Sequence, residues 1–260
     1  MAENGQIRIA LAGNPNCGKT TMFNNITGAK QHVGNYAGVT VEKKEGHTNF
    51  DGHELLFIDL PGTYSLTARS LDELVARNVI VNDNPDVIVN VLDASNLERN
   101  LYLAAQLLEL EKPMVIALNM SDVAEDMGIK YDLKKMAEMT GATIVSTVGR
   151  TNIGTKDLLA ATISVAASQK APGVTINYGD LLEGKINELV EELKQAGTVT
   201  YPLRWIAVKL LEKDADVIGK VMRFDNTAAV IQKAEAIREE IKDQVDLDIV
   251  FQEYRHRFAV

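Results

Sequence analysis

Apolar residues gather in short runs along the first two thirds of the chain, and amphipathic stretches separate these runs. The strand-like runs are IRIALAG, LLFIDL, VIVNVLD, MVIALNM and ATIVST. Segments such as NLYLAAQLLELE and DLKKMAEMTG have apolar positions at helical spacing. This alternation predicts the α/β class, with a doubly wound, mostly parallel sheet and helices on both faces. The stretch VTVEKKEGHTNFDGHELLFIDL adds one antiparallel edge.

The pattern changes after ASQKAPGVTINYGD, where the strand-like runs stop and helical periodicity takes over. Apolar stripes predict three helices, with stripes formed by Ile186, Leu189, Val190 and Leu193, by Leu203, Ile206, Ala207 and Leu210, and by Val230, Ala234, Ile237 and Ile241. The segment DIVFQEYRHRFAV predicts a fourth. We therefore predict an α/β domain over residues 1–170 and a small all-helical domain over residues 171–260.

The amino-acid composition limits the classes of ligand that the protein can bind and the cellular compartment in which we expect it. The net charge of -9 argues against nucleic-acid binding, because neutralising phosphates requires a surplus of Lys and Arg. The single cysteine, Cys17, cannot form an internal disulfide, which favours a reducing cytosol. The histidines are too scattered for a metal site, and no apolar run approaches the ~18 residues of a membrane helix. We expect the chain as given to be soluble.

The segment GNPNCGKT satisfies the phosphate-loop pattern G-x-x-x-x-G-K-[ST] and lies between a predicted strand and a predicted helix. Its glycines let backbone N–H groups surround a phosphate, Lys19 reaches the β- and γ-phosphates, and Thr20 offers its hydroxyl to Mg²⁺. The loop indicates a ligand that contains phosphate, but it does not distinguish one nucleotide base from another. The predicted phosphate-binding residues are Gly13, Asn14, Pro15, Asn16, Cys17, Gly18, Lys19, Thr20 and Thr21.

Two further segments predict contacts with the γ-phosphate and with magnesium. DLPG closes the strand LLFIDL, where Asp59 can hold Mg²⁺ through water and Gly62 can donate its N–H to the γ-phosphate. The loop QHVGNYAGVTVEKKEG contains Thr40, whose hydroxyl would join Mg²⁺ only when γ-phosphate is bound. A strand-end turn and a hairpin loop are the alternatives for these two segments. The predicted Mg²⁺ ligands are Thr20, Thr40 and Asp59.

The segment NMSD, at the end of another predicted strand, indicates which nucleotide base the site would bind. The Asp122 carboxylate can accept hydrogen bonds from the ring N–H and the exocyclic amine of guanine, whereas adenine presents an acceptor at the same place. Because unpaired buried acceptors are costly, the pocket should prefer guanine. A helix N-cap is the alternative role for Asp122. The predicted base contacts here are Asn119, Met120 and Asp122.

Taken together, the motifs resemble the amino-terminal cytosolic part of the ferrous iron transport protein B family. The resemblance rests on GNPNCGKT, GNYAGVTVEKKEG, DLPGTYSL, NLERNLYL and NMSD in this order, and it covers about residues 7–165. It implies a Ras-like GTP-binding domain, a helical GDP-dissociation-inhibitor-like spacer, and a membrane domain that moves Fe²⁺. Residues 178–260 suit the spacer by position and helical pattern, and the membrane domain is expected beyond this chain.

The resemblance also implies an activating K⁺ ion, held by the Asn16 amide and by carbonyls of the loop over residues 34–39. A bracing role for Asn16 within the phosphate loop is the alternative. The chain departs from the family where Cys17 replaces a common Ser, GNYAG replaces GNWPG, and Met120 fills a widespread Lys position. The base-supporting loop is the weakest match, and its predicted contacts are Ser146, Thr147 and Val148.

We expect a GTP hydrolase that acts as a molecular switch, with Mg²⁺ and K⁺ as cofactors and a catalytic set of Lys19, Asn16, Thr40 and Gly62. Thr63 stands where Ras-like enzymes place a water-orienting Gln, so intrinsic turnover should be slow. A GTP-gated binding module with negligible turnover is the alternative, and NMSD opposes a small-molecule kinase. Expected partners are GTP or GDP and the membrane domain of the full-length protein, at the cytoplasmic side of the inner membrane. The sequence does not decide whether the protein forms a homo-oligomer.

Overall fold

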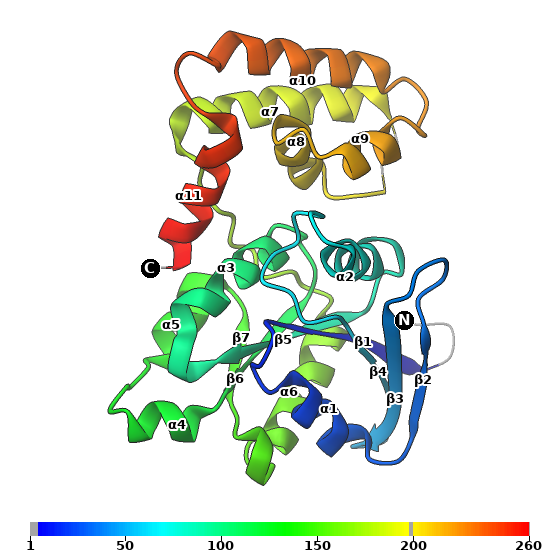
Figure 1. The fold of residues 1–260 in the computed structure, drawn as a ribbon, viewed down its shortest axis with the longest axis vertical. Coiled ribbons are helices and arrows are strands. Elements are labelled where there is room, and N and C mark those ends of the chain that lie inside the picture. The colour runs from blue at the N-terminus through cyan, green and yellow to red at the C-terminus, as the bar shows by residue number, and fades with distance from the viewer. Residues whose placement is uncertain (1–4, 198–199, 260) are drawn as a thin grey trace. The chain divides into compact units, whose positions relative to one another are not determined.

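Figure 1 shows the computed structural model, which describes residues 5–197 and 200–259. The chain forms two compact units, the first ending at Val174 and the second beginning at Thr175. The first unit combines a sheet with helices, and the second is helical throughout its described residues. The predicted α/β class with an appended helical domain is therefore confirmed.

The first unit is built on a seven-stranded sheet with the order β2-β3-β4-β1-β5-β6-β7. The five strands from β4 to β7 in this order are parallel, whereas β2 and β3 extend the β4 edge in antiparallel fashion. Strand β1 lies between β4 and β5, and its residues from Ile9 to Gly13 are buried. The strands are β1 (Gln6–Gly13), β2 (Gln31–Asn35), β3 (Glu42–Phe50), β4 (His53–Asp59), β5 (Val87–Asp93), β6 (Met114–Asn119) and β7 (Thr143–Ser146).

Strand β2 is the one strand that the sequence patterns do not predict. Its residues QHVGN pair with β3 over five positions, but none of the five side chains is buried. Backbone hydrogen bonds to β3 hold this exposed edge strand. Because none of its side chains has to be buried, its sequence does not alternate between apolar and polar residues. The segment expected as a loop around the nucleotide thus begins as a strand and becomes irregular only after Asn35.

Helices cover both faces of the sheet (Figure 1). On one face, α1 and α6 bury Phe23 and Leu158 against Ile9, Leu11 and Val89 of the central strands. On the other face lie α2 and α3, where α2 starts with a capping box between Ser70 and Glu73. The helices are α1 (Lys19–Thr27), α2 (Leu71–Asn82), α3 (Leu97–Leu108), α4 (Ser121–Asp126), α5 (Leu133–Thr140) and α6 (Thr155–Ser168), with 3₁₀ turns η1 (Ala94–Asn96) and η2 (Gly149–Thr151).

The parallel strands place their carboxyl ends at one edge of the sheet. Strand β1 ends at Gly13, β4 at Asp59 and β6 at Asn119, and the parallel register places all three ends on the same side of the sheet. In doubly wound sheets, ligands bind at this edge because the loops that leave the strands converge there. The fold therefore brings the predicted motifs to a common edge although they are far apart in the sequence.

The described residues of the second unit form five helices, α7 (Gly179–Ala196), α8 (Leu203–Leu211), α9 (Ala215–Val221), α10 (Ala228–Ile241) and α11 (Leu247–Ala259). The predicted stripes of α7 and α10 face its core, where Ile186, Leu189 and Ile237 are fully buried or nearly so. Helix α9 was not predicted because it is only two turns long and buries just Val217 and Val221. Among the described residues of both units, no helix is long and apolar enough to span a membrane.

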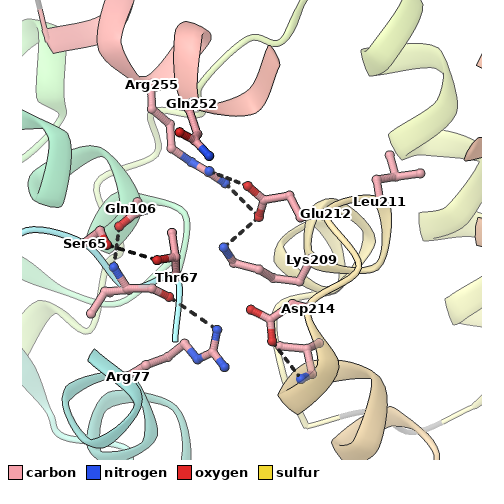
Figure 2. A network of polar contacts seen from close by, with 12 residues as sticks. Ser65, Thr67, Arg77, Gln106, Lys209, Leu211, Glu212, Asp214, Gln252 and Arg255 are labelled. Carbon is pink, nitrogen blue, oxygen red and sulfur yellow. Dashed lines mark hydrogen bonds and ion pairs between the residues drawn. The ribbon is translucent and has the colours of Figure 1, made fainter. Parts of the chain in front are cut away.

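A buried ionic cluster joins two helices of the second unit (Figure 2). The Arg255 guanidinium is fully buried and forms two hydrogen bonds with the Glu212 carboxylate, at 2.6 and 3.3 Å. The Lys209 ammonium lies 2.7 Å from the same carboxylate. Burial alone would raise the pKa of the Glu212 carboxyl, but the two adjacent cations lower it to about 2. The carboxylate therefore stays ionised and fixes α11 to the end of α8.

Candidate functional site

The phosphate loop connects the end of β1 to the start of α1. Its backbone enters the left-handed region at Asn16, with φ 67°, and at Gly18, with φ 86°. A Cβ atom at Gly18 would collide with the Asn119 amide, and one at Gly13 would lie 2.7 Å from both Cys17 Sγ and the Val91 carbonyl. Close approach thus requires glycine at both positions, and at Gly18 the left-handed backbone conformation requires it as well.

Lys19 joins the phosphate loop to the DLPG segment. Its ammonium is buried, donates to the Leu60 carbonyl at 2.6 Å, and forms an ion pair with Asp59. A buried cation requires such a partner, because desolvating an unpaired ammonium is costly. Two motifs forty residues apart therefore meet at the phosphate end of the site.

A hollow of about 590 Å³ lies beside this ion pair and has Thr40, Asp59 and Gly62 in its wall. The Thr20 and Thr40 side chains are exposed, so their hydroxyl oxygens are accessible to a ligand. Hydroxyl, carboxylate, phosphate and water oxygens are the donors that Mg²⁺ prefers, and it seldom uses a cage made entirely of protein groups. Within residues 5–197 and 200–259 no cluster of three His, Cys, Asp or Glu could hold a metal by itself. This donor set fits Mg²⁺ bound together with phosphate.

The base end of the site is a second hollow, of about 170 Å³, enclosed by loops after β1, β6 and β7. It contains Asp122 and the Met120 side chain, and Met120 adopts the left-handed conformation, with φ 57°, at the start of α4. The residues around this hollow are Gly18, Thr21, Asn119, Met120, Asp122, Val123, Val148, Gly149 and Arg150. The phosphate loop lines this hollow through Gly18, and the ion pair of Lys19 with Asp59 connects the same loop to the wall of the larger hollow.

Asn119 holds the base-binding loops together from inside. It is 2% exposed, and its amide Nδ2 donates to the Cys17 carbonyl at 2.8 Å. Its Oδ1 accepts the Gly149 N–H at 2.8 Å and also contacts the Thr147 hydroxyl. The side chain therefore braces the phosphate loop against the loop after β7, rather than projecting freely toward a base.

The Asp122 carboxylate already has a partner, since Arg150 Nη2 lies 2.7 Å from Asp122 Oδ2. Gly149, Arg150 and Val123 enclose the base hollow but were not among the predicted residues. Gly149 and Arg150 belong to the segment STVGR, but nothing in this segment indicates that Arg150 turns back toward Asp122. Of the predicted base-loop residues, Val148 borders the hollow, Thr147 is buried behind it, and Ser146 is exposed outside it.

The remaining residues of the phosphate loop have separate environments. Asn14 is buried and donates its amide to the Arg99 carbonyl at 3.0 Å, so its side chain points toward α3. Burial raises the pKa of the Cys17 thiol to about 11, although Lys19 acts in the opposite direction. The Asn16 side chain is exposed and forms no hydrogen bond with the residues that the structure describes. Its amide is therefore available to a ligand.

The predicted K⁺ loop and Thr63 also lie at the phosphate end. Tyr36 is half-buried, and its hydroxyl is 3.4 Å from the Asp59 carbonyl. Burial, followed by the nearby carboxylates, raises the pKa of this phenol above its ordinary range. Thr63 is 5% exposed and donates its backbone N–H to the Gly13 carbonyl at 3.3 Å. Its short side chain is thus packed inside instead of reaching into the hollow.

Comparison with known proteins identifies the family. The family model described as ferrous iron transport protein B matches residues 7–162, and that of the FeoB cytosolic helical domain matches residues 178–260. A fusion of Fe(2+) transport protein A with Fe(2+) transporter FeoB from Porphyromonas gingivalis is 46% identical over 216 residues, which are 81% of this chain and 26% of that protein. The Fe(2+) transporter FeoB of Shigella flexneri is 41% identical, over 80% of this chain and 27% of its own length.

Solved structures agree over both units. The cytosolic domain of the T. maritima FeoB iron transporter in its apo form has a TM-score of 0.85 at 30% identity, covering 98% of this chain and 96% of that one. The same T. maritima domain has been solved in GDP and GMPPNP forms. The cytosolic domain of L. pneumophila FeoB has a TM-score of 0.84 at 35% identity, with coverage of 97% and 96%.

These matches cover both units of the chain, which spans about a quarter of the length of its curated relatives. One family model matches the α/β unit and the other matches the helical unit, and the solved T. maritima relative with both parts has a GDP form. The chain belongs to the ferrous iron transport protein B family.

Proposed function

We propose that this chain binds guanine nucleotides and hydrolyses GTP, and that its nucleotide state controls Fe²⁺ passage through membrane segments of the whole protein. The observation that carries the proposal is that one phosphate loop lines the base hollow through Gly18 and pairs, through Lys19, with Asp59 in the wall of the other hollow. Asp122 lies in the hollow at the base end, while Thr40, Asp59 and Gly62 lie in the hollow at the phosphate end. This arrangement suits a base attached to a chain of phosphates.

Guanine selectivity follows from the chemistry of the base hollow. The Asp122 carboxylate accepts two hydrogen bonds, which matches the ring N–H and amine of guanine and opposes adenine. Met120 offers an apolar thioether stem to the flat face of the base. Asn119 acts indirectly, because it holds the Cys17 and Gly149 backbones at the separation that the base requires.

Hydrolysis would use water as the nucleophile, with catalysis that is mainly electrostatic. Lys19 places a positive charge beside the β- and γ-phosphates once Asp59 releases it, and the Gly62 N–H can donate to a γ-phosphate oxygen. Thr20, Thr40 and Asp59 would hold Mg²⁺, which neutralises charge on the phosphates. Thr63 is buried, so it supplies no group comparable to a water-orienting Gln. Intrinsic turnover should therefore be slow, at about 10⁻⁴ to 10⁻² s⁻¹.

Asn16 is the residue that would hold the proposed K⁺ ion. Its exposed amide has no internal partner among the described residues, which favours ligand binding over a bracing role in the loop. The segment over residues 34–39 begins in the last two residues of β2 and reaches the same end of the site through Tyr36, which approaches the Asp59 carbonyl. The Asn16 side-chain oxygen and carbonyls of this loop would supply oxygen donors suited to a monovalent cation.

The place of this chain in the whole protein follows from its family. Its curated relatives are Fe(2+) transporters about four times as long as the matched region. We assign the two units to the cytoplasmic side of the membrane, as the G domain from about residue 1 to 170 and the spacer from about residue 171 to 260. A nucleotide-gated binding module with negligible turnover is the competing function, since the buried Thr63 provides no side chain for catalysis.

Phosphate release measured against GTP concentration, with ATP alongside, tests the proposal. We expect slow, saturable release from GTP and none above background from ATP. Lys19→Ala should abolish release, whereas Lys156→Ala, an exposed lysine of α6, should leave it unchanged. Tight GTP binding without phosphate release would favour the binding module, and equal release from ATP would contradict the guanine site.

A further inference from the structure

The segment NLERN connects the phosphate loop to the residues that follow DLPG. It forms η1 and the start of α3, directly after β5. The buried Asn100 shapes this turn, because its Oδ1 accepts the Asp93 N–H at 3.2 Å and its Nδ2 donates to the Asn96 carbonyl at 2.8 Å. The turn is therefore rigid, and Arg99 lies within it at a fixed place.

Arg99 contacts two motifs at once. Its carbonyl accepts the Asn14 amide at 3.0 Å, which ties the phosphate loop to the first turn of α3. Its guanidinium lies 4.2 Å from the centroid of the Tyr64 ring, in the geometry of a cation–π contact. The side chain is exposed and forms no ion pair within the part of the chain that the structure describes. The Tyr64 ring is thus its principal partner.

Tyr64 directly follows the segment that would contact γ-phosphate. On its amino-terminal side, Thr63 donates its N–H to the Gly13 carbonyl. On its carboxyl-terminal side, the Leu66 N–H donates to Gln106 of α3 at 2.6 Å, and the Leu66 carbonyl accepts from Arg77 of α2 at 3.3 Å (Figure 2). Tyr64 lies between these anchors and is 41% exposed, so Arg99 is the group that fixes its ring.

We propose that Arg99 is a positioning residue for GTP hydrolysis, which holds Tyr64 and thereby aligns the Gly62–Thr63 backbone with the phosphate loop. The proposal rests on the proposed GTPase function and extends it to the segment NLERN. Gly62 and Thr63 precede Tyr64 without any intervening residue, so a loose Tyr64 ring would loosen the Gly62 N–H. The base hollow is formed by other loops, so guanine affinity should not depend on this contact.

The test compares single-turnover hydrolysis with GDP affinity in the full chain. Arg99→Met and Tyr64→Leu should each lower the hydrolysis rate about two- to five-fold, the equivalent of about 0.5–1 kcal/mol for an exposed cation–π pair. Tyr64→Phe keeps the ring and should retain the rate. The double variant should be no slower than either single variant, because one contact is lost in all three. The GDP dissociation constant should stay within about twofold throughout.

Arg223→Met is the matched control, because it removes an exposed arginine from the second unit. Additive losses in the double variant, a parallel loss of GDP affinity, or an unchanged rate in Arg99→Met would each overturn the proposal while leaving the GTPase function intact. No hydrolysis in the unmodified chain would instead overturn the proposed function, and the positioning role with it.

Discussion

The Arg150 guanidinium lies 2.7 Å from the carboxylate of Asp122, the residue that we propose binds guanine. Guanidinium and guanine present similar N–H donors to a carboxylate, so a base bound as we propose would compete with Arg150 for Asp122. Arg150 is 73% exposed, so it can leave the carboxylate without disturbing the fold. Arg150 is therefore an exposed internal partner that a guanine base would have to displace from Asp122.

Removing this competitor should strengthen nucleotide binding. We expect Arg150→Met to tighten GDP binding about two- to five-fold at low ionic strength, since exposed ion pairs are worth about 0.2–1 kcal/mol. The gain should shrink as salt screens the pair. Titration of GDP at two salt concentrations measures both effects, with Lys156→Met as a control of equal charge change. Weaker binding by Arg150→Met would mean that Arg150 contacts the nucleotide.

Potassium should accelerate hydrolysis through Asn16. In matched KCl and NaCl, we expect faster phosphate release in KCl, because a cation near the phosphates stabilises the charge that develops during the reaction. Asn16→Ala should lose the stimulation and retain GDP binding, since the exposed amide forms no internal hydrogen bond that the structure describes. Equal rates in the two salts for the unmodified chain would remove K⁺ from the account.

The Cys17 thiol should be inert in the folded protein. Burial, opposed by Lys19, raises its pKa to about 11, so at pH 8 the thiolate fraction is about a hundred times smaller than for a thiol with the ordinary pKa of 9.0. We expect native labelling by a thiol reagent to be at least that much slower than labelling in urea, and to speed up as the pH rises toward 11. Labelling at the same rate in both states would contradict the burial of Cys17.

Glu212 should govern the stability of the helical unit. Glu212→Gln leaves the fully buried Arg255 without a carboxylate, a change that typically costs about 3–5 kcal/mol. Trp205, the single tryptophan, is buried in α8 and reports on this unit, so urea unfolding followed by its fluorescence measures the loss. Glu253→Gln, which removes an exposed partner of Arg257, is the matched control. Equal midpoints for the two variants would contradict a structural role for the cluster.

The pH dependence of the same cluster has a definite sign. Burial alone would raise the pKa of Glu212, but the Lys209 and Arg255 cations outweigh it and lower this pKa from its ordinary value of 4.5 to about 2 in the folded state. A lowered acid pKa contributes stability above the unfolded value, and this contribution is lost as the pH falls from about 4.5 toward 2. The fluorescence midpoint should therefore fall over this range in the unmodified chain and less in Glu212→Gln.

Local patterns were sufficient to predict the fold class and the motifs at the strand ends. The alternation of apolar runs and amphipathic stretches predicted a mostly parallel sheet, and the left-handed Gly18 explains why its motif position is glycine. The short helix α9 and the exposed strand β2 were missed, because neither buries enough side chains to produce a periodic signal.

Contacts between distant segments were the part that the sequence could not supply. Asn14 and Asn119 have the residue types of ligand-binding amides, but their side chains brace backbones across the site. Arg150 and Arg99 each turn toward a residue in another loop, Asp122 and Tyr64 respectively. Such pairings follow from loop geometry in three dimensions, and nothing in the local spacing of residues specifies them.

The nucleotide preference of Asp122→Asn tests the guanine site most directly. An amide presents one acceptor and one donor where the carboxylate presents two acceptors, so it should pair poorly with guanine and better with xanthine, which carries an oxygen in place of the amine. Titrating GDP and XDP against both proteins should show GDP preferred by the unmodified chain and XDP by Asp122→Asn. Unchanged GDP affinity in the variant would contradict the assignment of Asp122 as the residue that reads the base.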